Sequence, residues 1–348
     1  MMRLININKI SKFKNSSFFL PNSVDLMCDG TIVICDGGND RVCLFDKDCK
    51  PINQYGKKGW HKNRFKEPVG AFVLKDENIF VMDWHNHRVV ELDKSLNYLY
   101  EFGHFSDSIA KPLLVESIFI EVKNILKIIK WLPLNGSYID FHFRKIVKIP
   151  VKYLKISEMI ISFFGFLNSL GLNLIHGVFF NGGFNKPNGI TSVNNNLIIT
   201  QKKNKCLSIH DNFRPYKRIK NIHRINNKDF GNLGNIHSSI DRIFICDELE
   251  GRIFILDLDF KYIDTIDEDN VSMPDFSPFS CCSIDDSLLA VVSQKIFLIF
   301  DFKNKKLIYK SEEIGELHGI VFNPTSKKIY VCDRANNCIH VYRIEDHY

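Results

Sequence analysis

The chain has 348 residues, of which 45% are hydrophobic, and its formal net charge is +6 at pH 7. This apolar fraction is that of a globular protein and excludes a disordered or collagen-like chain. The first residues, MMRLININKISKFKN, lack the continuous apolar run of a secretory signal peptide, so we expect no export.

The first expected element is an alternating strand at Arg3–Asn8, RLININ, which lies ahead of a longer recurring pattern. The clearest copy of that pattern is Gly30–Gly56, GTIVICDGGNDRVCLFDKDCKPINQYG. Runs of β-branched and aromatic residues, separated by Gly, Asn and Asp, predict four short strands per copy. Around this copy we expect strands at Ser23–Met27, Thr31–Cys35, Val42–Phe45 and Pro51–Tyr55.

Six copies follow one another along the chain, and in each an apolar run ends in a polar anchor residue. The anchors are Asp36, Asp83, Gln201, Asp247, Ser293 and Asp333, which are 47, 118, 46, 46 and 40 residues apart. A period in the forties with several strands per unit is typical of β-propeller blades. The one long step indicates an insertion between the second and third blades.

In the first two units the anchor is followed by Asn after three positions and by Arg after two more. The residues are Asp36, Asn39 and Arg41, and then Asp83, Asn86 and Arg88. We expect the aspartate to accept backbone N–H bonds from the following turn and the asparagine to take a left-handed turn conformation. The arginine should reach a carboxylate in the same blade or the next. The segments DGGNDRVCLFD and DWHNHRVVELD resemble NHL repeats, a family of six-bladed propellers with a D-x-x-N-x-R-[VI] core.

The resemblance covers the chain outside the insertion and implies an all-β, six-bladed NHL-type β-propeller. It is strongest in the first two units, and Gln201 and Ser293 depart from the family's aspartate. The sixth unit stops about one strand short. We therefore expect Arg3–Asn8 to supply its outer strand, which leaves the ring without an open edge. The expected division is residues 1–107 for the closing strand and blades 1–2, 108–180 for a helical insertion, and 181–348 for blades 3–6.

The ten cysteines do not indicate disulfides or a metal site. Three of them share one repeat position with Met, Thr and Val, namely Cys35, Cys246 and Cys332 against Met82, Thr200 and Val292. A position that accepts all four residue types is a packing position, so we expect structural thiols in a reducing compartment. Cys281 and Cys282 are adjacent and should lie on opposite faces of a strand. We expect no cofactor.

The insertion holds nine basic and four acidic residues, and therefore most of the net charge. An amphipathic helix is expected at Leu113–Leu132, and Met159–Ile175 is uncharged but short for a membrane span. The insertion could be a cap on the propeller or an element that docks on a partner or an anionic membrane. The docking residues would be Lys123, Lys127, Lys130, Lys148 and Lys152. We expect a cytoplasmic protein, either free or peripheral at the inner face of a membrane.

The face that carries the insertion also carries the turns after the anchors and the starts of the inner strands. Trp84-His85-Asn86-His87 stands out among these turns, because the other turns hold small or charged residues. The candidate ligand- or partner-binding residues are Trp84, His85, His87, Asn22, Asn188, His318 and Arg334. No catalytic residue is assigned, since neither a serine elbow nor a Gly-rich phosphate loop is present.

Three functional hypotheses remain. The first is a non-catalytic module or scaffold that binds a protein or small ligand on this face. The second is an NHL-like lyase or hydrolase acting in the central channel under the insertion. Peptidyl-hydroxyglycine lyases, which use this kind of propeller, place three histidines on zinc, whereas here only His318 and loosely His237 lie near inner-strand starts. The third is RNA binding, which the near-neutral charge of the propeller disfavours.

Overall fold

The computed structural model describes residues 3–74, 78–103, 184–211 and 214–345, and it is almost entirely β-structure. The expected helical insertion at 108–180, with its five docking lysines, lies outside these residues. Within them the longest helix is α5 (Glu268–Val271), and none is long and apolar enough to cross a membrane.

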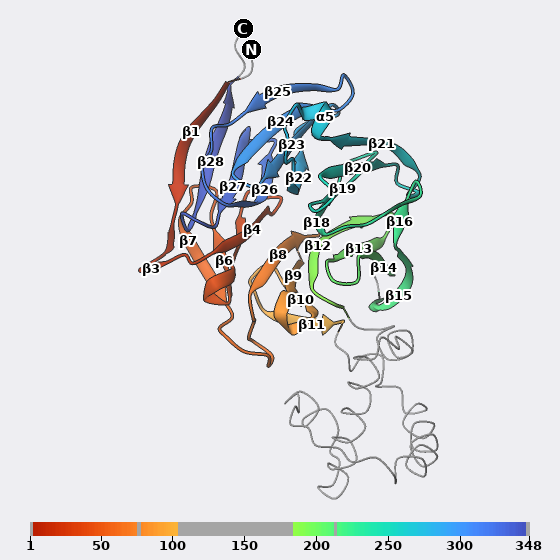
Figure 1. The fold of residues 1–348 in the computed structure, drawn as a ribbon. Helices are drawn as coiled ribbons and strands as arrows, with labels where there is room; N and C mark the ends of the chain where they lie inside the picture. Colours follow the sequence, from red (N-terminus) through yellow and green to blue (C-terminus); the bar gives the residue numbers. More distant parts are fainter. Residues whose placement is uncertain (1–2, 75–77, 104–183, 212–213, 346–348) are drawn as a thin grey trace, which may run out of the picture. The chain divides into compact units, whose positions relative to one another are not determined.

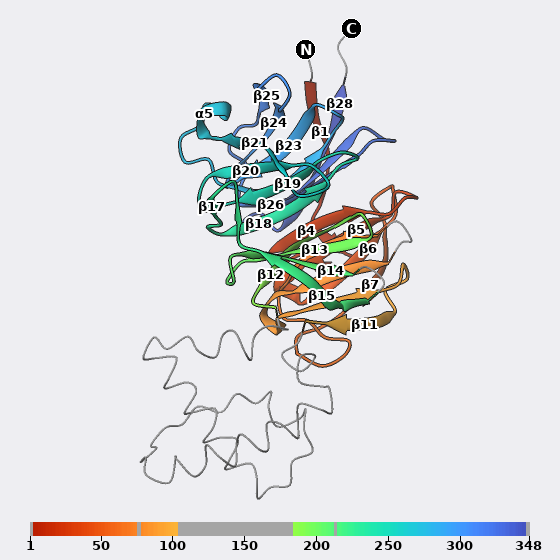
Figure 2. The ribbon, with the colours of Figure 1, turned by 90° about the vertical axis from the view of Figure 1, so that its right-hand side faces the viewer.

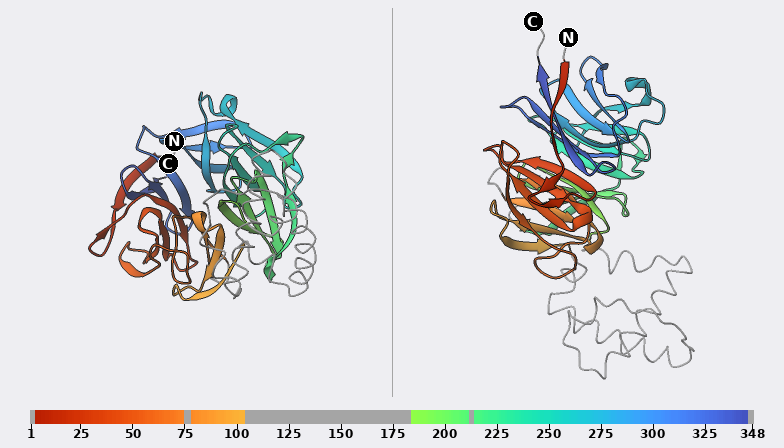
Figure 3. Two further views of the ribbon diagram at one scale, coloured as in Figure 1. Left: turned by 60° about the horizontal axis from the view of Figure 1, so that its bottom comes forward. Right: turned by 90° about the vertical axis from the view of Figure 1, so that its left-hand side faces the viewer.

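Six four-stranded antiparallel sheets follow one another in chain order around a ring (Figures 1 and 3). Blade 1 contains β4 (Pro21–Leu26), β5 (Ile32–Asp36), β6 (Arg41–Phe45) and β7 (Pro51–Tyr55). Blade 2 contains β8 (Pro68–Val73), β9 (Ile79–Asp83), β10 (Arg88–Leu92) and β11 (Tyr98–Phe102). Blade 3 contains β12 (Pro187–Val193), β13 (Asn196–Gln201), β14 (Cys206–Asp211) and β15 (Arg214–Ile222).

The second half of the ring repeats this arrangement. Blade 4 contains β18 (Leu233–Ser238), β19 (Ile243–Asp247), β20 (Arg252–Leu256) and β21 (Tyr262–Asp267). Blade 5 contains β22 (Pro278–Ser283), β23 (Leu288–Ser293), β24 (Ile296–Asp301) and β25 (Lys306–Lys310). Blade 6 contains β26 (Leu317–Asn323), β27 (Lys328–Asp333), β28 (Cys338–Glu345) and β1 (Arg3–Ile10). Two small hairpins, β2 (Lys12–Phe13) with β3 (Ser16–Ser17) and β16 (Arg224–Ile225) with β17 (Lys228–Asp229), lie in loops.

The ring closes through the first strand of the chain. β1 runs antiparallel to β28, from the pair Arg3 and Glu345 to the pair Ile10 and Ile339 (Figure 2). The expected role of the N-terminal strand as the outer strand of the last blade is confirmed. Its partner β28 therefore has a neighbour on both sides and exposes no row of unpaired backbone groups.

Every anchor residue is the last residue of the second strand of its blade, as the repeat predicts. In blades 1 and 2 the carboxylate accepts the N–H of the loop before the inner strand, from Phe19 to Asp36 and from Lys66 to Asp83, at 2.8 Å in both. The expectation that the following turn supplies this donor is therefore wrong in these blades. It is right in blade 6, where Asn336 donates its N–H to Asp333.

The motif asparagine also has a different role from the one expected. Asn39 and Asn86 lie in short 3-10 turns and donate their amides to the anchor carboxylates at 2.8 Å. The left-handed residue is the next one, Asp40 or His87, with φ of 55° and 54°. The anchor carboxylate thus holds the turn by accepting a hydrogen bond from the asparagine side chain. The asparagine contributes its amide donor and not a left-handed backbone conformation.

Apolar side chains fill the spaces between neighbouring sheets. Cys281 packs in the cluster between blades 4 and 5 and Cys282 in the cluster between blades 5 and 6, as their adjacency predicts. At single positions of the inner strands, neighbouring blades approach so closely that only glycine fits. A Cβ on Gly189 would lie 2.7 Å from the Cα of Asn235, so a larger residue there would force blades 3 and 4 apart.

Candidate functional site at the channel mouth

The turns that follow the anchors are fixed against the loops that lead into the inner strands. In blades 3, 4 and 6 the first turn residue donates its backbone N–H to the residue just before the inner strand. The pairs are Lys202 with Lys186, Glu248 with Asn232, and Arg334 with Glu316, at 3.1, 3.0 and 2.8 Å. These bonds hold charged side chains from several blades beside the starts of the inner strands. We call this end of the ring axis, where the inner strands begin, the mouth.

His318, the second residue of β26, is the centre of the strongest cluster. Its ring lies 3.9 Å from the ring of Phe279 on the neighbouring blade, measured between centroids. The imidazole Nε2 lies 3.2 Å from Nη1 of Arg334 and 3.4 Å from Oε1 of Glu316. The His318 side chain is only 14% exposed.

These contacts define the protonation of His318. A guanidinium can only donate, so Nε2 accepts from Arg334 and the neutral ring carries its proton on Nδ1. Burial lowers the pKa of His318, and Glu316 opposes this shift only in part. The pKa of Glu316 is itself lowered, mainly by its contact with His318 and further by the positive charge of Arg334. At neutral pH the cluster therefore contains a neutral imidazole between a guanidinium and a carboxylate.

A second set of contacts extends this cluster past blade 1. Arg334 Nη2 lies 3.6 Å from Glu67 Oε1, and Glu67 Oε2 lies 3.0 Å from His85 Nε2. The rings of His85 and Trp84 meet edge to face at 4.7 Å. The ammonium of Lys186 lies 3.8 Å from the centroid of a Trp84 ring, which is a cation–π contact.

On the other side of the mouth the cluster borders a cavity. Lys202 Nζ lies 2.8 Å from Glu248 Oε2 and 5.6 Å from the ring centroid of Phe279. Glu248 also lines a cavity of about 550 Å³ between blades 4 and 5. The acidic residues that line this cavity are Glu248, Glu250, Asp267, Glu268, Asp269 and Asp275.

Four of the residues expected at the site, Trp84, His85, His318 and Arg334, belong to this one network. The other three connect blades. Asn22 and Asn188 are 1% and 6% exposed, and their amides donate to Pro68 O and Leu233 O at the starts of the next inner strands. His87 accepts the backbone N–H of Lys186 on its Nδ1.

Glu67, Glu316 and Lys186 were not expected at the site. Each precedes the first residue of an inner strand, so aligning the six units on those strands would have placed them at the mouth. The charge of these three residues did not by itself predict a site, because charged residues are common in loops.

Several polar atoms of the network and of the neighbouring Asn22 are buried without a hydrogen-bond partner among the described residues. They are Trp84 Nε1, His318 Nδ1, Arg334 Nε and Asn22 Oδ1. Three of the four are donors in the protonation state derived above. Buried polar groups are normally paired, so three unpaired donors in one network are unusual, and an acceptor could reach them once the side chains that cover them move.

Comparison with known proteins adds only the fold. No protein-family model matches the chain, and no curated protein matches it in sequence. Among solved structures it is similar to a streptogramin B lyase, with TM-score 0.54 and 9% identity over 99% of this chain and 98% of that one. It is also similar to virginiamycin B lyase from Staphylococcus aureus, with TM-score 0.53 and 10% identity over 99% of both chains. At these identities the likeness establishes a six-bladed β-propeller and no more.

Proposed function

We propose that this protein is a ligand-binding propeller whose site is the mouth of the central channel. The observation that carries the proposal is the set of buried donors on Trp84, His318 and Arg334 that have no acceptor among the described residues. An unsatisfied buried donor costs about 1–3 kcal/mol. A bound molecule that accepts these bonds would recover that free energy.

The missing partners are acceptors, so the ligand would present carbonyl, carboxylate or phosphate oxygens. The three basic and three acidic side chains of the mouth balance one another, which disfavours a polyanion such as RNA. They are Lys186, Lys202 and Arg334 against Glu67, Glu248 and Glu316. The ring of Phe279 offers a planar surface beside His318. A small, polar and partly planar molecule matches these features better than a polymer, and a protein partner would engage the same side chains through a loop.

The proposal can be tested by thermal-shift screening of the full-length protein against small carboxylates, phosphates and cyclic esters. Compounds that bind at the mouth should raise the melting temperature of the wild type and lose this effect in Arg334→Gln and His318→Gln. A matched control is Lys295→Gln, which removes an exposed ion pair with Glu313 elsewhere. Hits that stabilise all four proteins equally would place binding outside the mouth and contradict the proposal.

Lyase chemistry is the second candidate, favoured by the state of His318. Burial lowers its pKa, and a neutral imidazole can remove a proton. Its Nε2 lone pair is held by Arg334, so a substrate oxygen that engages Arg334 would free it. The guanidinium would then stabilise negative charge on that oxygen. This is consistent with the fold shared with the two lyases, although the fold alone does not assign an activity.

A direct test is to incubate the wild type with virginiamycin B, with and without added divalent cations, and to follow the compound by mass spectrometry. Conversion without uptake of water, absent in His318→Gln, would support the lyase hypothesis. An unchanged compound excludes this activity and leaves the binding proposal, which the thermal-shift screen tests separately.

A further inference from the structure

Blade 6 departs from the charge pattern of the other aspartate-bearing blades. In blades 1, 2 and 4 the residue five positions after the anchor is an arginine bonded to the anchor carboxylate. The pairs are Arg41 with Asp36 at 2.7 Å, Arg88 with Asp83 at 2.7 Å, and Arg252 with Asp247 at 3.0 Å. In blade 6 that position is Cys338, and the contact with Asp333 is made by His340 at 3.0 Å.

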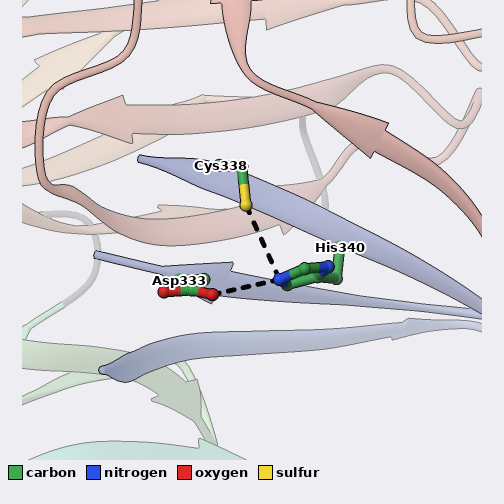
Figure 4. Close-up of side chains that lie close together, drawn as sticks. All are labelled: Asp333, Cys338 and His340. Atoms are coloured by element: carbon green, nitrogen blue, oxygen red, sulfur yellow. Dashed lines mark hydrogen bonds and ion pairs between the residues drawn. The ribbon is translucent and has the colours of Figure 1, made fainter. Parts of the chain in front are cut away.

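The three side chains converge on one point (Figure 4). Cys338 and His340 are two residues apart on β28, so they share a face of the strand, and Asp333 is directly opposite Cys338 on β27. Cys338 Sγ lies 3.6 Å from His340 Nε2, and the three ligand atoms lie within 4.8 Å of one another. Asp333 and Cys338 are 0% exposed and His340 is 9% exposed.

These separations are close to those of metal ligands. Tetrahedral zinc with bonds of about 2.3 Å to sulfur and about 2.0 Å to nitrogen and oxygen separates S from N by about 3.5 Å and N from O by about 3.3 Å. The observed distances of 3.6 and 3.0 Å differ from these by a few tenths of an ångström at most. The third separation, between the sulfur and the carboxylate oxygen, is within 4.8 Å.

Charge gives a second, independent reason. The carboxylate of Asp333 is buried, and besides His340 its hydrogen-bond partners are the backbone N–H and amide of Asn336, which are neutral. A buried anion needs a cation nearby, and the motif arginine that supplies it in three other blades is replaced here by a thiol. A divalent ion with Asp333 and a Cys338 thiolate would form a neutral complex.

We propose that Asp333, Cys338 and His340 form a binding site for a thiophilic divalent metal ion such as zinc, which replaces the motif arginine in blade 6. On binding, the Cys338 thiol loses its proton to solvent and the sulfur coordinates the ion. A water molecule takes the fourth position. Without metal this cysteine is no nucleophile, because burial raises its pKa to about 11.

The closing strand contributes the outer contact of this site. Asn6 on β1 has its amide nitrogen 3.3 Å from Nδ1 of His340, so the imidazole proton is on Nε2 in the unliganded arrangement. When Nε2 binds a metal, the proton moves to Nδ1 and the amide of Asn6 turns over, so that its oxygen accepts. Metal binding is therefore coupled to the strand pairing that closes the ring.

Cobalt is the probe for the test, because a thiolate ligand gives Co²⁺ a near-ultraviolet charge-transfer band. The full-length protein is stripped with a chelator and titrated with Co²⁺, then with Zn²⁺. We expect one Co²⁺ per chain, a thiolate band that zinc removes, and a zinc-dependent rise in melting temperature. Cys338→Ser should lose the band, and Asn6→Ala should bind roughly tenfold more weakly because its orienting bond is lost.

Two thiol controls define the background. Cys43→Ser removes the blade 1 residue equivalent to His340, and Cys28→Ser removes an exposed thiol that could bind cobalt adventitiously. Both variants should keep the band. If Cys338→Ser does not fold, His340→Gln is the test variant. Its amide can still donate a hydrogen bond to Asp333, so it should fold, but it lacks the imidazole ligand. A wild type without the thiolate band, or a band that persists in Cys338→Ser or His340→Gln, overturns the proposal.

Discussion

Arg334 of blade 6 lies 3.6 Å from Glu67, which precedes blade 2, although blade 1 stands between them in the ring. Blade 1 has Gly37 at the turn position that Arg334 occupies in blade 6. A Cβ on Gly37 would lie 2.0 Å from the amide nitrogen of Asn22, so glycine lets this turn pack directly on the inner strand of blade 1. The Arg334–Glu67 pair therefore joins blades 6 and 2, which are not neighbours, at the mouth that we propose as the binding site.

Replacing Arg334 with glutamine should affect binding far more than stability. The side chains of Arg334 and Glu67 are 18% and 27% exposed, and such pairs typically contribute under about 1 kcal/mol. We expect a shift in urea-unfolding free energy of this size, together with loss of stabilisation by ligands found in the screen. A fall of several kcal/mol would instead make Arg334 a structural residue.

Replacing Asp83 with alanine should destabilise the protein by about 3 kcal/mol or more, because it removes one partner of a buried ion pair. Arg88 is 1% exposed and would keep Glu101 as its only carboxylate, while Lys66 N–H and the Asn86 amide would lose their acceptor. Chemical denaturation measures the change.

The comparison for this variant is Ser293→Ala, at the same place in blade 5. Within the part of the chain that the structure describes, the Ser293 hydroxyl accepts the N–H of Ser277 alone, so the expected loss is about 1 kcal/mol. Equal losses in the two variants would show that the ion pair of blade 2 adds nothing beyond a single hydrogen bond.

Asp25, on the inner strand of blade 1, should make stability depend on pH. Burial raises the pKa of its carboxyl from the usual 3.8 to about 6. Between these values the folded protein holds a proton that the unfolded chain has released. The free energy of unfolding therefore falls as pH rises from about 4 to about 6, by up to about 3 kcal/mol.

The variant Asp25→Asn removes this titration and keeps an oxygen that can accept the N–H of Val73, which lies 2.7 Å away in the wild type. Relative to wild type, the variant should gain stability between pH 4 and pH 7 in urea-unfolding measurements. If the amide changes the unfolding free energy by the same amount at every pH, the pH dependence of the difference between the two proteins is unaffected. Parallel curves for the two proteins would mean that Asp25 titrates at its ordinary pKa.

Removing residues 1–10 should cost several kcal/mol, because β28 loses a partner strand and Ile10, 5% exposed, loses its place in the core. Thermal unfolding measures the effect. Ile7→Ser is the matched control in the same strand, since Ile7 is 38% exposed and should be replaceable at little cost. An unchanged melting temperature after the deletion would show that β1 does not hold the ring closed.

Six units, their four strands and their anchors could be read from the sequence alone. The reason is that each blade is built from local antiparallel pairs, so alternation and turn residues within about 45 residues specify it. The same locality predicted β1 as the missing strand and the bonds of Arg41 and Arg88 to carboxylates, and the structure shows that these carboxylates belong to their own blades. The source of the N–H bound by Asp36 was mispredicted, because the donor, Phe19, belongs to the loop that precedes the blade.

Only the tertiary structure decided which residues from different blades meet. Glu67 and Arg334 are 267 positions apart, and their contact depends on the number of blades and on the closure of the ring. The exchange in blade 6, where His340 takes the carboxylate contact that arginine makes elsewhere, depends on the facing strand. The sequence pattern predicts how a strand pairs with its neighbour within a blade. The contacts at the mouth and in blade 6 join residues that are brought together only when the strands and blades are assembled into the closed ring.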